Sequence, residues 1–122
     1  MTPQGAALMA QYNRWMNDRI FEAAGRLDDA TLAAERGAFF GSILATLNHI
    51  AVADTIWLHR FARHPASFPA LGALAGFAHP ASLRQTLAPD LAGLRVYRRE
   101  LDDLIQRWVA EIRPEHLAVD LA

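Results

Sequence analysis

The sequence predicts an all-α protein, a bundle of long amphipathic helices. Three long segments carry apolar residues at intervals of three and four positions, which is the spacing of one face of an α-helix. The sequence shows no pair of alternating segments typical of strands, no internal repeat and no low-complexity tract. With 122 residues, the chain is long enough for one core and too short for a second. We therefore expect residues 1–122 to form a single helical bundle domain.

The first helix is expected to begin at Thr2 and Pro3, a capping residue followed by a proline at the first helical position. Its predicted buried stripe consists of Leu8, Tyr12, Trp15, Met16, Ile20, Ala23 and Leu27. Its predicted solvent face carries Gln11, Arg14, Asp18, Glu22 and Arg26. A connection over residues 28–41 should follow, with a single helical turn at residues 29–34.

The second helix is expected over residues 42–63, with Ser42 as its capping residue. It is apolar over most of its circumference, which favours a position in the middle of the bundle. Residues 64–80 contain several prolines and glycines and are apolar rather than charged. We therefore expect this loop to wrap around the bundle.

The third helix is expected to begin near residues 86–89 and to continue to Ile112, before Pro114. It carries two pairs of opposite charges four residues apart, which we interpret as solvent-facing pairs that contribute little to stability. These pairs are Arg98 with Asp102 and Arg99 with Asp103. The three tryptophans are spaced like core residues. The apolar faces of the three predicted helices are wide enough to favour packing against a fourth helix. The chain ends at Ala122, where that helix is expected to begin.

The composition excludes several functional classes. The formal net charge is −1 and the arginines are scattered, so no basic stripe is present for a nucleic-acid backbone. The absence of cysteine excludes disulfides, thiolate metal sites and cysteine nucleophiles. No apolar run is long enough for a membrane span, and the amino end lacks the pattern of a signal peptide. We expect a cytoplasmic protein, and the bias toward arginine and alanine favours a bacterial source.

The most informative single residue is His49, which lies within an otherwise apolar helix. Burial of a titratable ring is costly unless the ring is paired, so His49 is either a hydrogen-bonded core residue or a metal ligand. A catalytic site of the zinc type needs about three protein ligands. His59 lies on the same helix ten positions away, about 15 Å along the axis, and His64 is further still, so neither can share a metal with His49. His79 and His116 lie in loops and remain open as partners.

Asp54 lies at the edge of the apolar stripe of the second helix. A carboxylate buried there must be paired, and Arg19 or Arg98 from a facing helix is a candidate partner. We interpret Asp54 as a member of a structural ion pair rather than as a catalytic base.

Four stretches together resemble the DinB family of small metal-binding helical bundles. The first is YNRWMN at residues 12–17, and the second is GAFFGSILATLNH at residues 37–49. The third is Asp54 with Trp57, and the fourth is Arg98 followed by Leu101 and Asp102. The similarity covers nearly the whole chain, and the stretch that ends at His49 is its most specific part.

The resemblance implies an up-down four-helix bundle with one long crossover, usually dimeric. It also implies a divalent metal (zinc, nickel or iron) held by three histidines, of which one comes from the second helix and corresponds to His49. The other two come from the fourth helix, so residues 1–122 are expected to bind metal weakly and to be incomplete at the C-terminus. The implied activity is that of a thiol-dependent transferase or a hydrolase acting on a small molecule, with a low-molecular-weight thiol as partner. The alternative is a non-catalytic helical dimerisation module in which His49 is structural.

Overall fold

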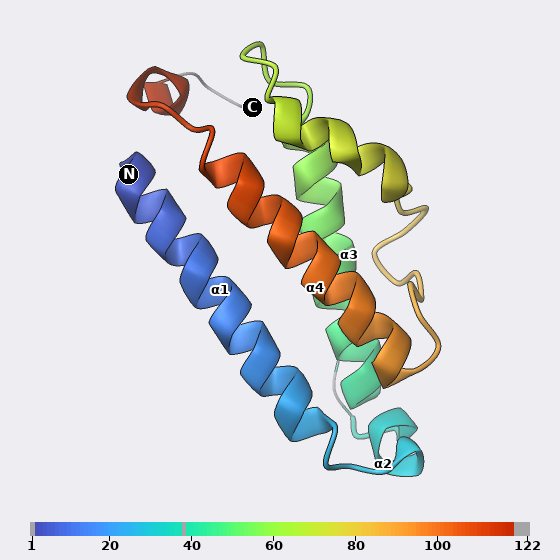
Figure 1. The fold of residues 1–122 in the computed structure, drawn as a ribbon. Coiled ribbons are helices and arrows are strands. Elements are labelled where there is room, and N and C mark those ends of the chain that lie inside the picture. The colour runs from blue at the N-terminus through green and yellow to red at the C-terminus, as the bar shows by residue number, and fades with distance from the viewer. Residues whose placement is uncertain (1, 38, 119–122) are drawn as a thin grey trace.

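The computed structural model describes residues 2–37 and 39–118, which form a bundle of helices (Figure 1). Its elements are α1 (Pro3–Ala24), α2 (Asp29–Ala33), α3 (Ile43–Phe61), the 3-10 helix η1 (Pro69–Gly76), α4 (Leu91–Val109) and the 3-10 helix η2 (Pro114–Ala118). The described residues contain no β-strand, which confirms the predicted all-α class. Within this part of the chain, none of the helices combines the length and apolarity needed to cross a bilayer.

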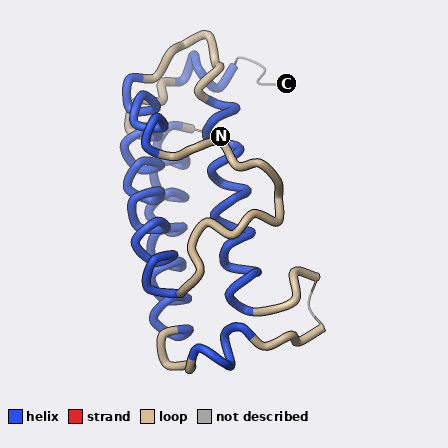
Figure 2. The backbone as a smooth tube through the Cα atoms, turned by 90° about the vertical axis from the view of Figure 1, so that its right-hand side faces the viewer, coloured by secondary structure: helices blue, strands red, loops and turns tan. Residues whose placement is uncertain are grey.

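The three long helices lie side by side, and α1 runs antiparallel to both α3 and α4 (Figures 1 and 2). The helices α3 and α4 are parallel to each other because the long segment of residues 62–90 returns the chain to the starting end of the bundle. Most of the helix packing joins α1 to α4, and α4 also packs on α3. This arrangement is the predicted up-down bundle with a long crossover. The predicted fourth helix lies outside the described residues.

The helices begin where side chains can cap their first turn. In each case a side-chain oxygen accepts a hydrogen bond from the backbone N–H three residues ahead. The four caps are Thr2, Asp28, Ser42 and Asp90. The starts predicted at Thr2 and Ser42 are therefore confirmed. Helix α4 begins later than predicted, at Leu91, because Asp90 rather than a residue near Thr86 caps it.

The buried face of α1 is not the predicted one. Leu8, Tyr12 and Trp15 are between 53 and 66 % exposed. The residues of α1 that are buried instead are Ala6, Ala10, Phe21 and Ala24. Small side chains let α1 approach α4 closely, and polar side chains between them bond to α4. Of the three tryptophans assigned to the core, Trp108 packs there, whereas Trp15 and Trp57 are exposed.

The crossover wraps around the bundle, as its apolar composition predicted. One apolar cluster joins η1 of the crossover to α3 and α4, because η1 presents one of its faces to both helices. The buried members of the cluster are Leu58, Leu71, Leu74, Phe77, Leu101 and Leu104. The crossover is therefore part of the core, and it fixes how the ends of α3 and α4 are positioned.

Candidate functional site

His49 projects from α3 against the crossover and not into the core between the long helices, where it was expected. Its Nδ1 atom lies 3.0 Å from the carbonyl oxygen of Leu83. Its ring stacks on Phe40, with 3.7 Å between ring centroids and 19° between ring planes. Because a carbonyl oxygen only accepts hydrogen bonds, Nδ1 must carry a proton, and in the neutral imidazole Nε2 then keeps its lone pair. The ring borders a small hollow of about 60 Å³.

The neighbouring residue, Asn48, fixes the loop that contacts His49. Its side chain is 3 % exposed. Its Oδ1 atom accepts hydrogen bonds from the backbone N–H groups of Leu87 and Ala88, at 2.8 and 3.2 Å. Its Nδ2 group donates to the carbonyl of Ala88 at 3.2 Å. This role was not predicted from the sequence, although an asparagine inside an apolar helix indicates that its amide must be hydrogen-bonded.

Phe40 connects His49 to the crossover from the other side. The guanidinium of Arg84 lies 5.1 Å from the centre of the Phe40 ring and 5.2 Å from that of Phe39. Arg84 also donates to the backbone carbonyl of Phe39, at 3.4 Å. The imidazole of His49 is thus oriented by the Phe40 ring stacked on its face and by the Leu83 carbonyl at its edge.

The other histidines lie elsewhere. His59 and His79 form one pair, with 5.0 Å between ring centroids, and His64 and His116 form another at 6.2 Å. Neither loop histidine, His79 or His116, supplies a second ligand beside His49. Among the residues that the structure describes, no group of three histidines, aspartates or glutamates could hold a metal ion. In the part of the chain that the structure describes, no second histidine therefore lies beside His49.

A buried ionic network links the three long helices. Arg98 donates from Nη2 to Asp54 at 2.8 Å and to Asp102 at 2.6 Å. The side-chain amides of Asn13 and Asn17 donate to Asp102 at 3.1–3.2 Å. The predicted ion pair of Asp54 is therefore confirmed with Arg98 as its partner.

Of the two charge pairs of α4, Arg98 with Asp102 was wrongly predicted to face solvent, whereas Arg99 and Asp103 are exposed as predicted. Arg98 and Asp102 are each only 2 % exposed, because this face of α4 packs between α1 and α3. Burial raises the pKa of Asp102 above its ordinary value, and the neighbouring Arg98 opposes that shift. In the second predicted pair, Arg99 contacts Asp18 and Asp103 contacts Arg14, so these charges bridge α4 to α1.

Comparison with known families identifies the fold. The DinB family model matches residues 1–120, which is almost the whole chain. This chain belongs to the DinB family. No curated protein and no solved structure shows significant similarity to it. The resemblance carried by residues 12–17 and 37–49 is thereby confirmed at the level of family and fold.

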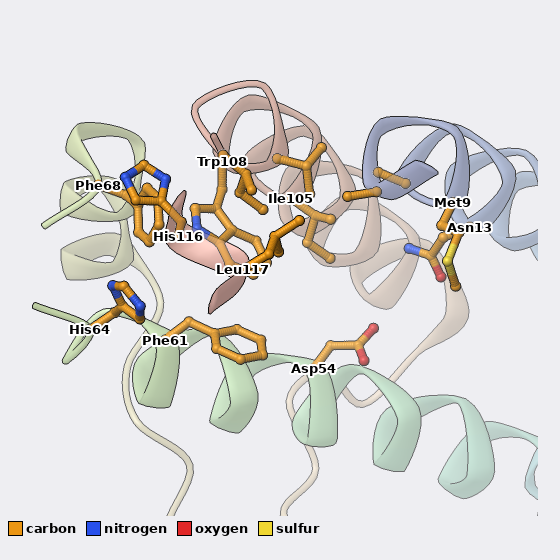
Figure 3. Close-up of a pocket in the computed structure, with 14 residues that line it drawn as sticks. Met9, Asn13, Asp54, Phe61, His64, Phe68, Ile105, Trp108, His116 and Leu117 are labelled. Carbon is orange, nitrogen blue, oxygen red and sulfur yellow. The ribbon is translucent and has the colours of Figure 1, made fainter. Parts of the chain in front are cut away.

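This DinB-family chain also contains a larger cavity, which the sequence did not reveal. It has a volume of about 450 Å³ and lies between α1, α3, α4 and η2 (Figure 3). Asp54 and Asn13 face each other at one end, and His64, Phe68 and His116 lie at the other. The walls between these ends are apolar, with residues such as Phe61, Ile105 and Trp108. His49 borders the smaller hollow and not this cavity. Only tertiary packing could create the cavity, because its lining comes from segments as far apart in the sequence as Ala6 and Leu117.

Proposed function

We propose that this DinB-family protein is a divalent-metal-dependent enzyme in which His49 provides one imidazole ligand through Nε2. The observation that carries the proposal is the hydrogen bond from Nδ1 of His49 to the carbonyl of Leu83. Histidines that bind metals commonly donate their second ring N–H to a carbonyl or carboxylate, which fixes the tautomer and the ring orientation. Phe40, stacked on the ring, restricts its rotation further.

The described residues supply one such ligand, so the proposal requires two more imidazoles. We propose that they come from a fourth helix outside the described residues, as the resemblance implies. Imidazole ligands suit zinc, nickel and iron. When bound, the metal would activate a thiol or a water molecule for attack on a small-molecule substrate, as in a transferase or hydrolase. Leu83 and Phe40 would orient His49 for this role, and Asn48 would position the loop that contains Leu83.

The ring nitrogens of the histidines offer a direct test. Two-bond ¹H–¹⁵N spectra of the chain should show His49 with a protonated Nδ1 and an unprotonated Nε2. Addition of Zn²⁺ should shift the Nε2 resonance of His49, and His49→Gln should abolish that response. His79→Gln, a matched substitution at a histidine away from the site, should leave the response unchanged. A protonated Nε2 at His49, or zinc shifts confined to the other histidines, would refute the proposal.

A second candidate function is dimerisation, and the outer face of α1 favours it. We propose that Leu8, Tyr12 and Trp15 form the contact with a second copy of the chain. These side chains share one face of α1 and are more than half exposed, and the rings of Tyr12 and Trp15 lie 5.9 Å apart. Exposed apolar patches of this kind are typical of protein interfaces. If the chain dimerises through this face but His49 fails the zinc test, the chain is better described as a helical dimerisation module.

The molar mass of the chain in solution tests whether it dimerises through this face. Light scattering should report a dimer for the wild-type chain and a monomer for Trp15→Gln. Trp57→Gln is the matched control, because Trp57 is also exposed but lies on α3. The candidate fails if the wild-type chain is a monomer, or if both substitutions change the mass equally.

A further inference from the structure

Two histidines meet where the last turn of α3 lies against the crossover, away from His49. His59 is in that last turn, and His79 follows η1 in the crossover. Their ring centroids lie 5.0 Å apart, with an angle of 46° between the ring planes. The fold therefore brings together two imidazoles that are well separated in the sequence.

Backbone carbonyls determine which nitrogen of each ring carries hydrogen. Nε2 of His59 lies 2.7 Å from the carbonyl oxygen of Phe77, and Nδ1 of His79 lies 3.1 Å from that of Pro80. Because a carbonyl oxygen only accepts hydrogen bonds, each of these two nitrogens donates and carries a proton. In the neutral rings, Nδ1 of His59 and Nε2 of His79 therefore keep their lone pairs. This is the form in which an imidazole binds a metal, with its second N–H donated to a carbonyl.

The separation of the two rings matches that of two imidazoles bound to one metal ion. Metal–nitrogen bonds of about 2.0–2.1 Å place each ring centroid about 3.2 Å from the metal. Ligand angles between about 90°, as in square-planar sites, and about 109°, as in tetrahedral sites, then separate the centroids by about 4.5–5.2 Å. The observed 5.0 Å lies within this range. A metal ion can therefore bridge the two rings without a large movement of either.

Both histidines are on parts of the backbone that the core holds in place. His59 follows Leu58, which is 2 % exposed. His79 is itself exposed, but Phe77 and Pro80 on either side of it are buried. The carbonyls that orient the two rings belong to these same buried residues. The pair is therefore preorganised, and little conformational freedom is lost when a ligand binds to it.

Solvent can complete the coordination of a metal at this position. His79 is exposed and His59 is half-buried. Within residues 2–37 and 39–118, no third histidine or carboxylate joins them in a metal-binding group. Two protein ligands leave the remaining positions to water or to a small exogenous ligand. Without a third protein ligand to impose a geometry, the affinities should follow the general order for divalent first-row metals, in which Cu²⁺ binds most tightly.

We propose that His59 and His79 form a surface site for a divalent transition metal, with Nδ1 of His59 and Nε2 of His79 as its ligands. Cu²⁺ binds there more tightly than Ni²⁺ or Zn²⁺. The bound ion joins α3 to the crossover and so stabilises the folded chain. The site shares no ligand with the metal centre proposed at His49, so neither proposal depends on the other.

Calorimetric titration of Cu²⁺ into the His49→Gln variant tests the site without a contribution from His49. His59→Gln and His79→Gln, each added to that variant, should weaken the tightest binding by at least about tenfold, since even a group that only supports a metal ligand typically contributes 10–100-fold. His116→Gln is the matched control, because it removes a histidine of the other pair and should leave the affinity unchanged. Circular dichroism verifies that each variant is folded. Unchanged Cu²⁺ affinity in folded His79→Gln, or an equal loss in His116→Gln, would overturn the proposal.

Two-bond ¹H–¹⁵N spectra identify the ligand atoms. Zn²⁺, which is diamagnetic, should shift Nδ1 of His59 and Nε2 of His79 in the His49→Gln variant, with the same midpoint for both. A common midpoint shows that the two rings bind one ion. Different midpoints, a shift of only one ring or of neither, or binding through the nitrogens that face Phe77 and Pro80 would refute the shared site.

Discussion

Replacement of Asn48 by alanine is expected to reduce the free energy of unfolding by about 3–7 kcal/mol, because one buried amide serves three backbone groups of the crossover. The N–H and carbonyl groups of Ala88 are buried and would lose their partner, which costs about 1–3 kcal/mol each. The half-buried N–H of Leu87 adds about 1 kcal/mol. A loss of this size is a large fraction of the stability of a small domain.

Urea denaturation followed by far-ultraviolet circular dichroism measures this loss as a lower midpoint at an unchanged slope. Gln11→Ala is the control, since Gln11 is an exposed amide on α1 and its replacement should change stability by less than about 0.5 kcal/mol. The same substitution of Asn48 should release the loop that contains Leu83, so the Nδ1–H form of His49 should become less populated. A loss below about 1 kcal/mol, or an unchanged tautomer of His49, would refute this role of Asn48.

Three further outcomes are expected. Arg98→Met should destabilise the protein by about 3–5 kcal/mol in urea denaturation, because Asp54 and Asp102 would lose their shared cation, and a change below about 1 kcal/mol would contradict a buried network. Because burial raises the pKa of Asp102, the folded state binds its proton more tightly than the unfolded state does. The free energy of unfolding of the wild type relative to Asp102→Asn should therefore fall as pH rises above about 4, and a rise would reverse the sign of the shift. Ser42→Ala removes the acceptor of the Ala45 N–H and should cost about 1 kcal/mol, measured as a lower Tm, whereas an unchanged Tm would argue against the cap.

The candidate site was predictable only in part. The sequence pointed to His49, and the residues around it carried the family resemblance. The groups that orient the ring, Phe40 and the carbonyl of Leu83, were not identified, because Leu83 is 34 residues away and its loop has no periodic pattern. The sequence left Arg19 and Arg98 as alternative partners of Asp54. Only the packing of α3 on α4 shows that the partner is Arg98.

The sequence by itself determined the three long helical segments and where the first two of them begin. Caps such as Thr2 and Ser42, and apolar spacings of three and four, act between residues within one or two turns, so they can be recognised without knowledge of the fold. Tertiary structure decided which face of each helix is buried. The faces on which α1 and α4 meet carry polar side chains that form hydrogen bonds or ion pairs with each other, such as Asn17 with Asp102. A prediction from hydropathy alone places such residues at the solvent-exposed surface. A polar side chain can be buried only when its partner is in place, and that partner lies on a distant part of the chain.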